Sequence, residues 1–231
     1  MNISCLNQGC VELVNYTPNG DLLVVNSARC SFDMEHEEWD EEKDSGLIKY
    51  LAKHKHLLPF RHPSATIRIE APIYVLRQLG KHQVGFSWSE VSRRYIKKNP
   101  HFHYPMPQDW RKSSPDVKQG SLNEGLDKEV RSDVDKEIDS FYCDAEEMYY
   151  NLLDKGVCPE QARMVLPQAM MTTTVTTGTL LGWHHMFTMR TEEHTQRETQ
   201  EYAYAIGEIL SSIFPYSWTA LNEDYNNVDP S

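Results

Sequence analysis

The feature that most limits how this chain can fold is a long run of apolar residues spaced three or four apart. The run comprises Val130, Val134, Ile138, Phe141, Ala145, Met148 and Leu152. This spacing places all of them on one face of an α-helix, and Gly156 is of a type that commonly ends a helix. The sequence therefore predicts one long amphipathic helix that ends near residue 156.

Shorter patterns in the chain predict strands. The segment "SATIRIEA" alternates Ala65, Ile67 and Ile69 with polar residues, which is typical of a half-buried strand. The β-branched run "MMTTTVTTGT" favours an extended conformation, although it could also lead straight into a helix at Gly178. Residues 10–16 and 21–26, with "PNG" between them, are expected to form a β-hairpin.

The remaining segments predict further helices and loops. Helices are expected over residues 42–56, where "LLPF" ends the helix, over 73–82 after Pro72, in "PEQARMVLP", over 180–189 and over 192–213. The stretch "GFSW" is interpreted as a loop, and residues 99–125, rich in Pro, Ser and Gly, as a long excursion. Mixed strands and helices without a βαβ rhythm indicate an α+β fold, expected as a single domain over residues 1–231.

Charge and cysteine content exclude several classes of function. The formal net charge of −11 argues against binding to a nucleic acid polymer, although residues 77–98 hold six basic side chains against one carboxylate, which suits a small anion. No signal peptide or membrane-spanning run is apparent, so a cytoplasmic location is expected. Five cysteines without a CxxC pair, and histidine pairs without a third ligand, predict neither a disulfide framework nor a metal site.

Six short motifs carry a resemblance to a known family. They are "SARCSF" (27–32), "HKHLLPFRH" (54–62), "APIYVLRQLGKH" (71–82), "SEVSRRY" (89–95), "QARMVLP" (161–167) and "MR" (189–190). In this order they resemble the flavin-dependent thymidylate synthases over about residues 11–223. The family signature is Arg-His-Arg, seven residues and Ser. This chain has Lys-His-Gln at 81–83, eight residues and Ser92, with Glu90 and Arg94 in their places.

The resemblance implies an activity and a set of site residues. The expected reaction is the reductive methylation of dUMP to dTMP, with methylenetetrahydrofolate as carbon donor and NADPH as reductant for bound FAD. The expected assembly is a homotetramer with a mostly antiparallel sheet, long flanking helices and sites built from several subunits. The positions that match dUMP contacts are Gln78, Lys81, Glu90, Ser92, Arg93, Arg94, Arg163 and Arg190. Those that match FAD contacts are Lys81, His82, Gln83, Glu90, His56, Arg61 and His185.

The chemistry of these residue types suits the implied reaction. Guanidinium groups at Arg94 and Arg163, with the Ser92 hydroxyl, can form charge-assisted bonds to a phosphate dianion. Arg190 is the expected catalytic residue, because a permanent cation stabilises negative charge that develops on the pyrimidine ring. No covalent enzyme nucleophile is expected, and the redox step belongs to the flavin.

Departures from the family pattern gather on the flavin side. Lys81 and Gln83 replace two arginines, and Leu58 and Arg61 replace a hydroxyl and a carboxylate. Leu181 is aligned with the arginine of the family's Asn-x-Arg pattern. Because Lys cannot reproduce the bidentate geometry of Arg, two alternatives stay open. One is an enzyme that makes a 5-hydroxymethyl product from dUMP or dCMP. The other is a non-catalytic nucleotide-binding homologue.

Overall fold

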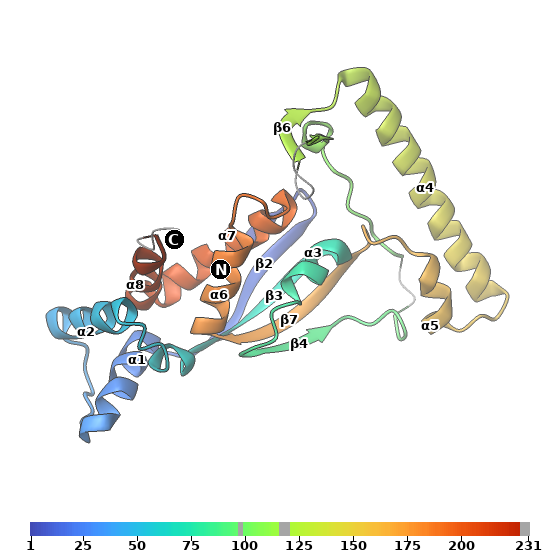
Figure 1. Cartoon of the computed structure of the whole chain (residues 1–231). Helices are drawn as coiled ribbons and strands as arrows, with labels where there is room; N and C mark the ends of the chain where they lie inside the picture. The colour runs from blue at the N-terminus through green and yellow to red at the C-terminus, as the bar shows by residue number, and fades with distance from the viewer. Residues whose placement is uncertain (97–98, 116–120, 227–231) are drawn as a thin grey trace.

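The computed structural model describes residues 1–96, 99–115 and 121–226, and its centre is a five-stranded antiparallel sheet (Figure 1). The strands are β1 (Asn2–Cys5), β2 (Gly9–Tyr16), β3 (Ser64–Pro72), β4 (Phe86–Glu90) and β7 (Met171–Thr179). They lie in the order β1-β2-β3-β7-β4, so the strand that comes latest in the chain lies between two earlier ones. Helices form most of the remaining chain, which confirms the predicted α+β class.

The helices come between and after the strands of the sheet. They are α1 (Gly20–Arg29), α2 (Glu41–Lys53), α3 (Ile73–Leu79), α4 (Lys128–Asp154), α5 (Pro159–Ala162), α6 (Leu180–Arg190), α7 (Arg197–Ile213) and α8 (Pro215–Asn226). Short 3-10 turns occur at η1 (Cys30–Phe32), η2 (Pro59–Arg61), η3 (Pro107–Asp109) and η4 (Arg163–Val165). Within the described residues, no helix is both long enough and apolar enough to cross a membrane.

The helices that the sequence predicted are present, with shifted ends. The long amphipathic helix is α4, and it ends two residues before Gly156. Helix α3 ends at Leu79, so His82 lies in the turn that follows it and not in the helix. Helix α2 ends at Lys53, α7 begins at Arg197 after an irregular segment, and α8 was not predicted at all.

Strand β3 shows why the sheet has one apolar and one polar face. Ala65, Ile67 and Ile69 are at most 1% exposed and face the core, whereas Arg68 lies on the opposite face and forms an ion pair with Glu12 of β2 at 2.9 Å. The strand is paired on both sides, to β2 and to β7. The alternation read from the sequence is therefore confirmed.

Strand β7 is extended, as its threonines predicted, and it leads directly into α6. The hydroxyl of Thr179 accepts a hydrogen bond from the Gly182 N–H at 3.1 Å and caps the helix. One residue earlier, Gly178 leaves no room for a side chain, because a Cβ there would overlap the Phe86 ring. This glycine lets β4 and α6 approach β7 closely.

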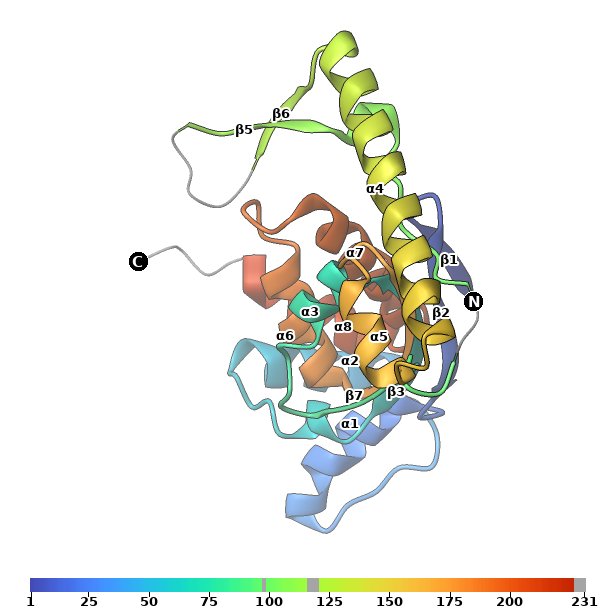
Figure 2. The same ribbon diagram turned by 90° about the vertical axis from the view of Figure 1, so that its right-hand side faces the viewer.

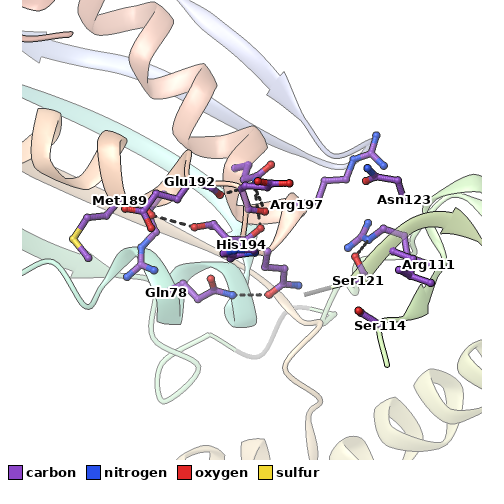
Figure 3. Close-up of a pocket in the computed structure, with 15 residues that line it drawn as sticks. Gln78, Arg111, Ser114, Ser121, Asn123, Met189, Glu192, His194 and Arg197 are labelled. Atoms are coloured by element: carbon purple, nitrogen blue, oxygen red, sulfur yellow. Dashed lines mark hydrogen bonds between the residues drawn. The ribbon is translucent and has the colours of Figure 1, made fainter. Parts of the chain in front are cut away.

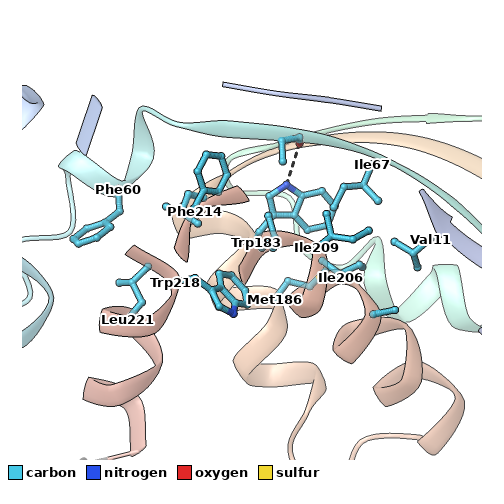
Figure 4. Close-up of a cluster of buried hydrophobic side chains, with 14 of the residues drawn as sticks. Val11, Phe60, Ile67, Trp183, Met186, Ile206, Ile209, Phe214, Trp218 and Leu221 are labelled. Carbon is cyan, nitrogen blue, oxygen red and sulfur yellow. Dashed lines mark hydrogen bonds between the residues drawn. The ribbon is translucent and has the colours of Figure 1, made fainter. Parts of the chain in front are cut away.

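The main hydrophobic core lies between the sheet and helices α3, α6 and α7, and it continues to α1, α2 and α8 (Figure 4). Trp183 of α6 is fully buried in it, and its indole N–H donates to the carbonyl of Ala65 at 3.1 Å. Ile67, Ile206 and Phe214 are buried around it. Because the tryptophan has its only polar atom bonded to β3, it fixes α6 on the sheet.

The predicted hairpin over residues 10–26 is wrong. Strand β2 pairs with β1 and β3 instead, and the "PNG" turn leads into α1. Asn19 adopts a left-handed conformation (φ 51°), and Gly20 packs so tightly against Phe214 that no Cβ fits. The four apolar residues that follow were read as a strand, but a short apolar run does not distinguish a strand from a buried helix.

Two other expectations concern the middle of the chain. The stretch "GFSW", interpreted as a loop, contributes to β4, which pairs with β7 at the edge of the sheet. The excursion over residues 99–125 is present, but it contains a small hairpin of β5 (Arg111–Ser113) and β6 (Ser121–Gly125), hereafter the β5–β6 hairpin. The part of this prediction on residues 116–120, like Lys97 and Lys98, lies outside the described residues.

The β5–β6 hairpin and α4 form an extension at one side of the molecule, away from α1 and α2 (Figures 1 and 2). A small second cluster, centred on Phe102, Tyr142 and Met170, covers part of α4. Phe141 and Met148, from the apolar run that predicted this helix, are about half exposed in the single chain. The apolar surface of α4 is therefore only partly covered by its own chain.

Helices α1 and α2 are joined by a buried ion pair. Arg29 donates from Nη2 to Oδ1 of Asp44 at 2.6 Å, and the two side chains are 11% and 0% exposed. The other carboxylate oxygen of Asp44 accepts the backbone N–H of Asp40 at 2.9 Å. Asp40 in turn caps α2, so one carboxylate organises both the helix start and the contact between the helices.

Candidate functional site

The first part of the candidate site is the turn that follows β4. The strand ends at Glu90, whose partner on β7 is Thr174, and the next N–H, of Val91, donates to the carbonyl of Thr173 at 2.9 Å. Ser92 then organises the turn, because its hydroxyl accepts hydrogen bonds from the backbone N–H and the Nε–H of Arg94. Glu90, Ser92 and Arg94 are thus brought together at one end of the sheet edge.

The second part of the site is centred on Arg190, the last residue of α6. Its Nε–H donates to Nε2 of His82 at 3.0 Å. The His82 ring also lies edge-on to His185 of the same helix as Arg190, with ring centroids 5.9 Å apart. Two positions that the resemblance assigns to FAD therefore lie beside the residue that it assigns to catalysis.

The electrostatics of this pair are set by burial. Burial, reinforced by the charge of Arg190 and by His185, lowers the pKa of His82 to about 4. Burial also lowers the pKa of Arg190, although an arginine stays protonated at neutral pH. The pair therefore consists of a neutral imidazole and a charged guanidinium at pH 7.

Arg190 and Gln78 line a pocket of about 1050 Å³. Figure 3 shows Gln78 and Met189 on one side of it and Ser121 and Asn123, from the β5–β6 hairpin, on the other. The Gln78 side chain donates to Gln196, in the segment between α6 and α7. The pocket is therefore enclosed by three parts of the chain that lie far apart in the sequence.

Sequence reasoning missed two contributors to this pocket. One is the segment over residues 191–200, "TEEHTQRETQ", which contributes Glu192, His194 and Arg197 to the lining. Ten consecutive polar residues directly after Arg190 were the signal that could have indicated it. The other contributor is the β5–β6 hairpin, whose residues carry no comparable local signal.

The hairpin is held over the pocket by Arg111. This side chain donates to Oε1 of Glu198 on α7 and to the Ser121 hydroxyl, both at 2.8 Å. Burial acts to raise the pKa of the Glu198 carboxyl, but hydrogen bonds from Arg111 and from its own backbone N–H outweigh burial, and the pKa is lowered. Trp110, directly before β5, donates from its indole N–H to Asp135 of α4 at 2.7 Å. The hairpin is therefore bonded to both α7 and α4.

The other predicted site residues lie on exposed elements of the single chain. Arg163, in η4, donates to the carbonyl of Glu160 at 3.3 Å, and Arg93 donates to that of Asn99 at 3.2 Å. Neither residue lines the pocket that contains Arg190, and Arg94 does not line it either. The two arginines that the resemblance assigns to phosphate therefore lie outside the pocket of Arg190, which it assigns to catalysis, in a single protomer.

The predicted FAD positions are also largely exposed. Lys81 and Arg61 present charged side chains, and His56 lies edge-on to Tyr50. The Gln83 amide donates to the carbonyl of Gly80 in its own turn. Gln83 therefore uses its side chain locally, where the family pattern has a guanidinium.

Comparison with known proteins identifies the family. The family model described as "Thymidylate synthase complementing protein" matches residues 12–216. A flavin-dependent thymidylate synthase of Thermotoga neapolitana is 35% identical over 220 residues, which cover 95% of this chain and 94% of that protein. The chain belongs to the flavin-dependent thymidylate synthase family. The resemblance read from the six motifs is confirmed.

Other members of the flavin-dependent thymidylate synthase family support the same conclusion. An enzyme of Thermus thermophilus is 33% identical over 96% of this chain and 79% of its own length. Among solved structures, the UMP/dUMP methylase PolB of Streptomyces cacaoi, bound with 5-Br dUMP, superposes with a TM-score of 0.84 at 30% identity. That superposition covers 96% of this chain and 97% of the methylase. The fold and the family are therefore shared over nearly the whole chain.

Proposed function

We propose that this chain is an FAD-dependent enzyme that converts dUMP to dTMP, with methylenetetrahydrofolate as carbon donor and NADPH as reductant. The observation that carries the proposal is the placement of Arg190, which is charged, partly buried, held by a neutral histidine and on the wall of a large pocket. The names of the relatives support it, because the curated ones are flavin-dependent thymidylate synthases and the solved one is a UMP/dUMP methylase.

The proposed role of Arg190 is electrostatic. Its guanidinium would face a carbonyl oxygen of the uracil ring and stabilise the negative charge that forms as C5 becomes nucleophilic. A buried site strengthens this effect, because less water screens the charge. Cys5, which is buried in the core, is not suited to act as a covalent nucleophile instead, because burial raises the pKa of its thiol to about 12.

The proposed nucleotide site needs more than one copy of the chain. Arg94 and Arg163, with Ser92, would hold the phosphate dianion, while Gln78, Lys81, Glu90 and Arg93 would contact the rest of the nucleotide. Because Arg94 and Arg163 lie outside the pocket of Arg190 in one protomer, we propose that a homotetramer completes the site. The half-exposed apolar residues of α4 support association with another copy.

The residues at the proposed flavin site fit an anionic cofactor with an aromatic ring system. Lys81 and Arg61 offer exposed cations for a pyrophosphate, and His185, which lies edge-on to the buried His82 ring, offers an exposed imidazole. His56, Gln83 and Glu90 complete the proposed set. When bound, FAD supplies the hydride chemistry, and the protein orients the flavin beside the nucleotide and excludes water.

The residues at the proposed flavin site favour a second candidate function. Leu58 is 66% exposed where the family pattern has a hydroxyl, and the Gln83 amide is bonded to its own turn. A remodelled cofactor site of this kind supports an enzyme that releases a 5-hydroxymethyl nucleotide in place of a methyl one. The substrate of that reaction would be dUMP or dCMP.

One incubation tests both candidates. Purified protein should be yellow and should convert dUMP to dTMP in the presence of methylenetetrahydrofolate and NADPH, as measured by the mass of the nucleotide product. A hydroxymethyl product would replace the first proposal with the second. Protein that binds dUMP in calorimetry but takes up no flavin and gives no product would overturn both.

A further inference from the structure

The contact between His82 and Arg190 fixes the chemical state of the histidine. A guanidinium can only donate hydrogen bonds, so Nε2 of His82 must accept with its lone pair. The ring proton therefore resides on Nδ1. An imidazolium has no lone pair, so the contact exists only while His82 is neutral, which agrees with its lowered pKa.

The histidine is held firmly enough to act as a fixed acceptor. Its residue is 9% exposed, its backbone N–H donates to the carbonyl of Leu79 at 3.1 Å, and its carbonyl accepts the Trp88 indole N–H at 3.1 Å. The ring also lies against His185. Both the backbone and the ring of His82 are therefore positioned by neighbours on α3, β4 and α6.

This contact determines which edge of Arg190 is available. The guanidinium has five N–H groups, and the one on Nε is used by His82. Among the described residues, the bond from Nε is the only hydrogen bond of the Arg190 side chain, and the charge of Glu192 acts on the guanidinium without a hydrogen bond to Nη1 or Nη2. The planar group thus retains its outer fork, which is the edge suited to a carbonyl oxygen or another acceptor in the pocket.

We propose that His82 is a positioning residue for Arg190: it accepts the Nε–H and holds the guanidinium with its outer fork toward the pocket. The catalytic meaning of this role rests on the proposed function, whereas the contact itself does not. The resemblance assigned His82 to the flavin. The geometry adds a role toward the nucleotide-activating arginine.

A matched pair of variants separates this role from general packing. In His82→Gln the side-chain oxygen lies near the original Nε2 and can still accept the hydrogen bond from Arg190. In His82→Asn the side chain is too short for its oxygen to reach Arg190. We expect His82→Asn to lower kcat about 10- to 100-fold, with a much smaller change in the KM for dUMP, because a misdirected catalytic group loses transition-state stabilisation. His82→Gln should keep most of the kcat that His82→Asn loses. The control is His101→Gln, which replaces an exposed histidine in the same way.

A double-variant cycle provides the decisive kinetic test. Lysine has no Nε–H at the position that contacts His82, so His82→Asn should have no further effect on kcat in an Arg190→Lys background. Losses that multiply in the double variant would overturn the proposal. Equal activity of His82→Gln and His82→Asn would also overturn it.

A spectroscopic test does not depend on any activity. Solid-state NMR of the full chain labelled with ¹⁵N-histidine should show a signal for the Nδ1–H tautomer that disappears in His82→Gln. The Nε2 resonance of this signal should move in Arg190→Met. If the protein proves inactive on uridylates but keeps this signal, the proposed function fails and the positioning contact remains. An Nε2–H tautomer at His82 would overturn the contact itself.

Discussion

Loss of the Asp44 carboxylate is expected to destabilise the fold more than most single substitutions. In Asp44→Asn, the amide oxygen can still accept the Asp40 N–H, but the Arg29 guanidinium loses its counter-charge. That guanidinium is 11% exposed, and its Nη1 already lacks a partner among the described residues. Leaving one charge of a buried pair uncompensated costs about 3–5 kcal/mol. This is a large part of the roughly 5–15 kcal/mol that stabilises a typical domain.

The assay is urea unfolding at one fixed protein concentration, applied to Asp44→Asn, Arg29→Met and the double variant. Because each single variant leaves a different buried charge unpaired, the double variant should be at least as stable as either single one. Lys43→Met is the control, since Lys43 forms an exposed pair with Asp40 and should cost less than about 1 kcal/mol. Losses of Asp44→Asn and Arg29→Met that simply add in the double variant would refute the reasoning.

Three further predictions concern packing, pH and the hairpin. Gly178→Ala should cost about 1–3 kcal/mol in thermal unfolding because its Cβ overlaps a neighbouring ring, whereas Gly46→Ala, where nothing lies within 4 Å, should cost nothing. Burial lowers the pKa of His184 to about 4 from an ordinary 6.5, so the unfolded chain binds more protons between these values. Stability should therefore fall by on the order of 3 kcal/mol as the pH drops from 6.5 to 4, and His184→Phe should flatten that slope in pH-dependent melting curves. Glu198→Gln should speed amide hydrogen exchange in the β5–β6 hairpin, because the salt bridge to α7 is lost; unchanged exchange would show that the hairpin is held by other contacts.

Local sequence patterns correctly predicted the elements in which buried side chains recur at a regular interval. The long helix α4 and the strand β3 have clear periods, and the β-branched side chains of β7 favour an extended chain in any context. Two errors have the opposite cause. Residues 20–29 hold a short apolar run that fits a strand or a helix, and in the fold Gly20 packs against Phe214, a residue far along the chain that a local pattern does not include. Residues 86–90 become a strand because β7, far along the chain, pairs with them.

The candidate site follows the same division. Family motifs named Arg190 and Gln78, and both lie on the pocket. The contact between Arg190 and His82 joins residues 108 positions apart, so no local pattern could have predicted it. The contribution of residues 191–200 depends on where α7 begins, which a periodicity argument placed too early, at residue 192 instead of Arg197.

The strand order has a consequence for how the protein is made. Strand β4 leaves the ribosome well before β7, the strand beside which it lies in the sheet, which follows after about 80 residues. At roughly 5–20 residues per second, that interval is on the order of 4–16 s. During this interval, the aromatic segment of β4 in the nascent chain has no strand partner. The edge of β3 that later pairs with β7 must also stay unpaired. Variants that slow translation between the two strands should therefore lower the yield of native protein more than variants that slow it before β4.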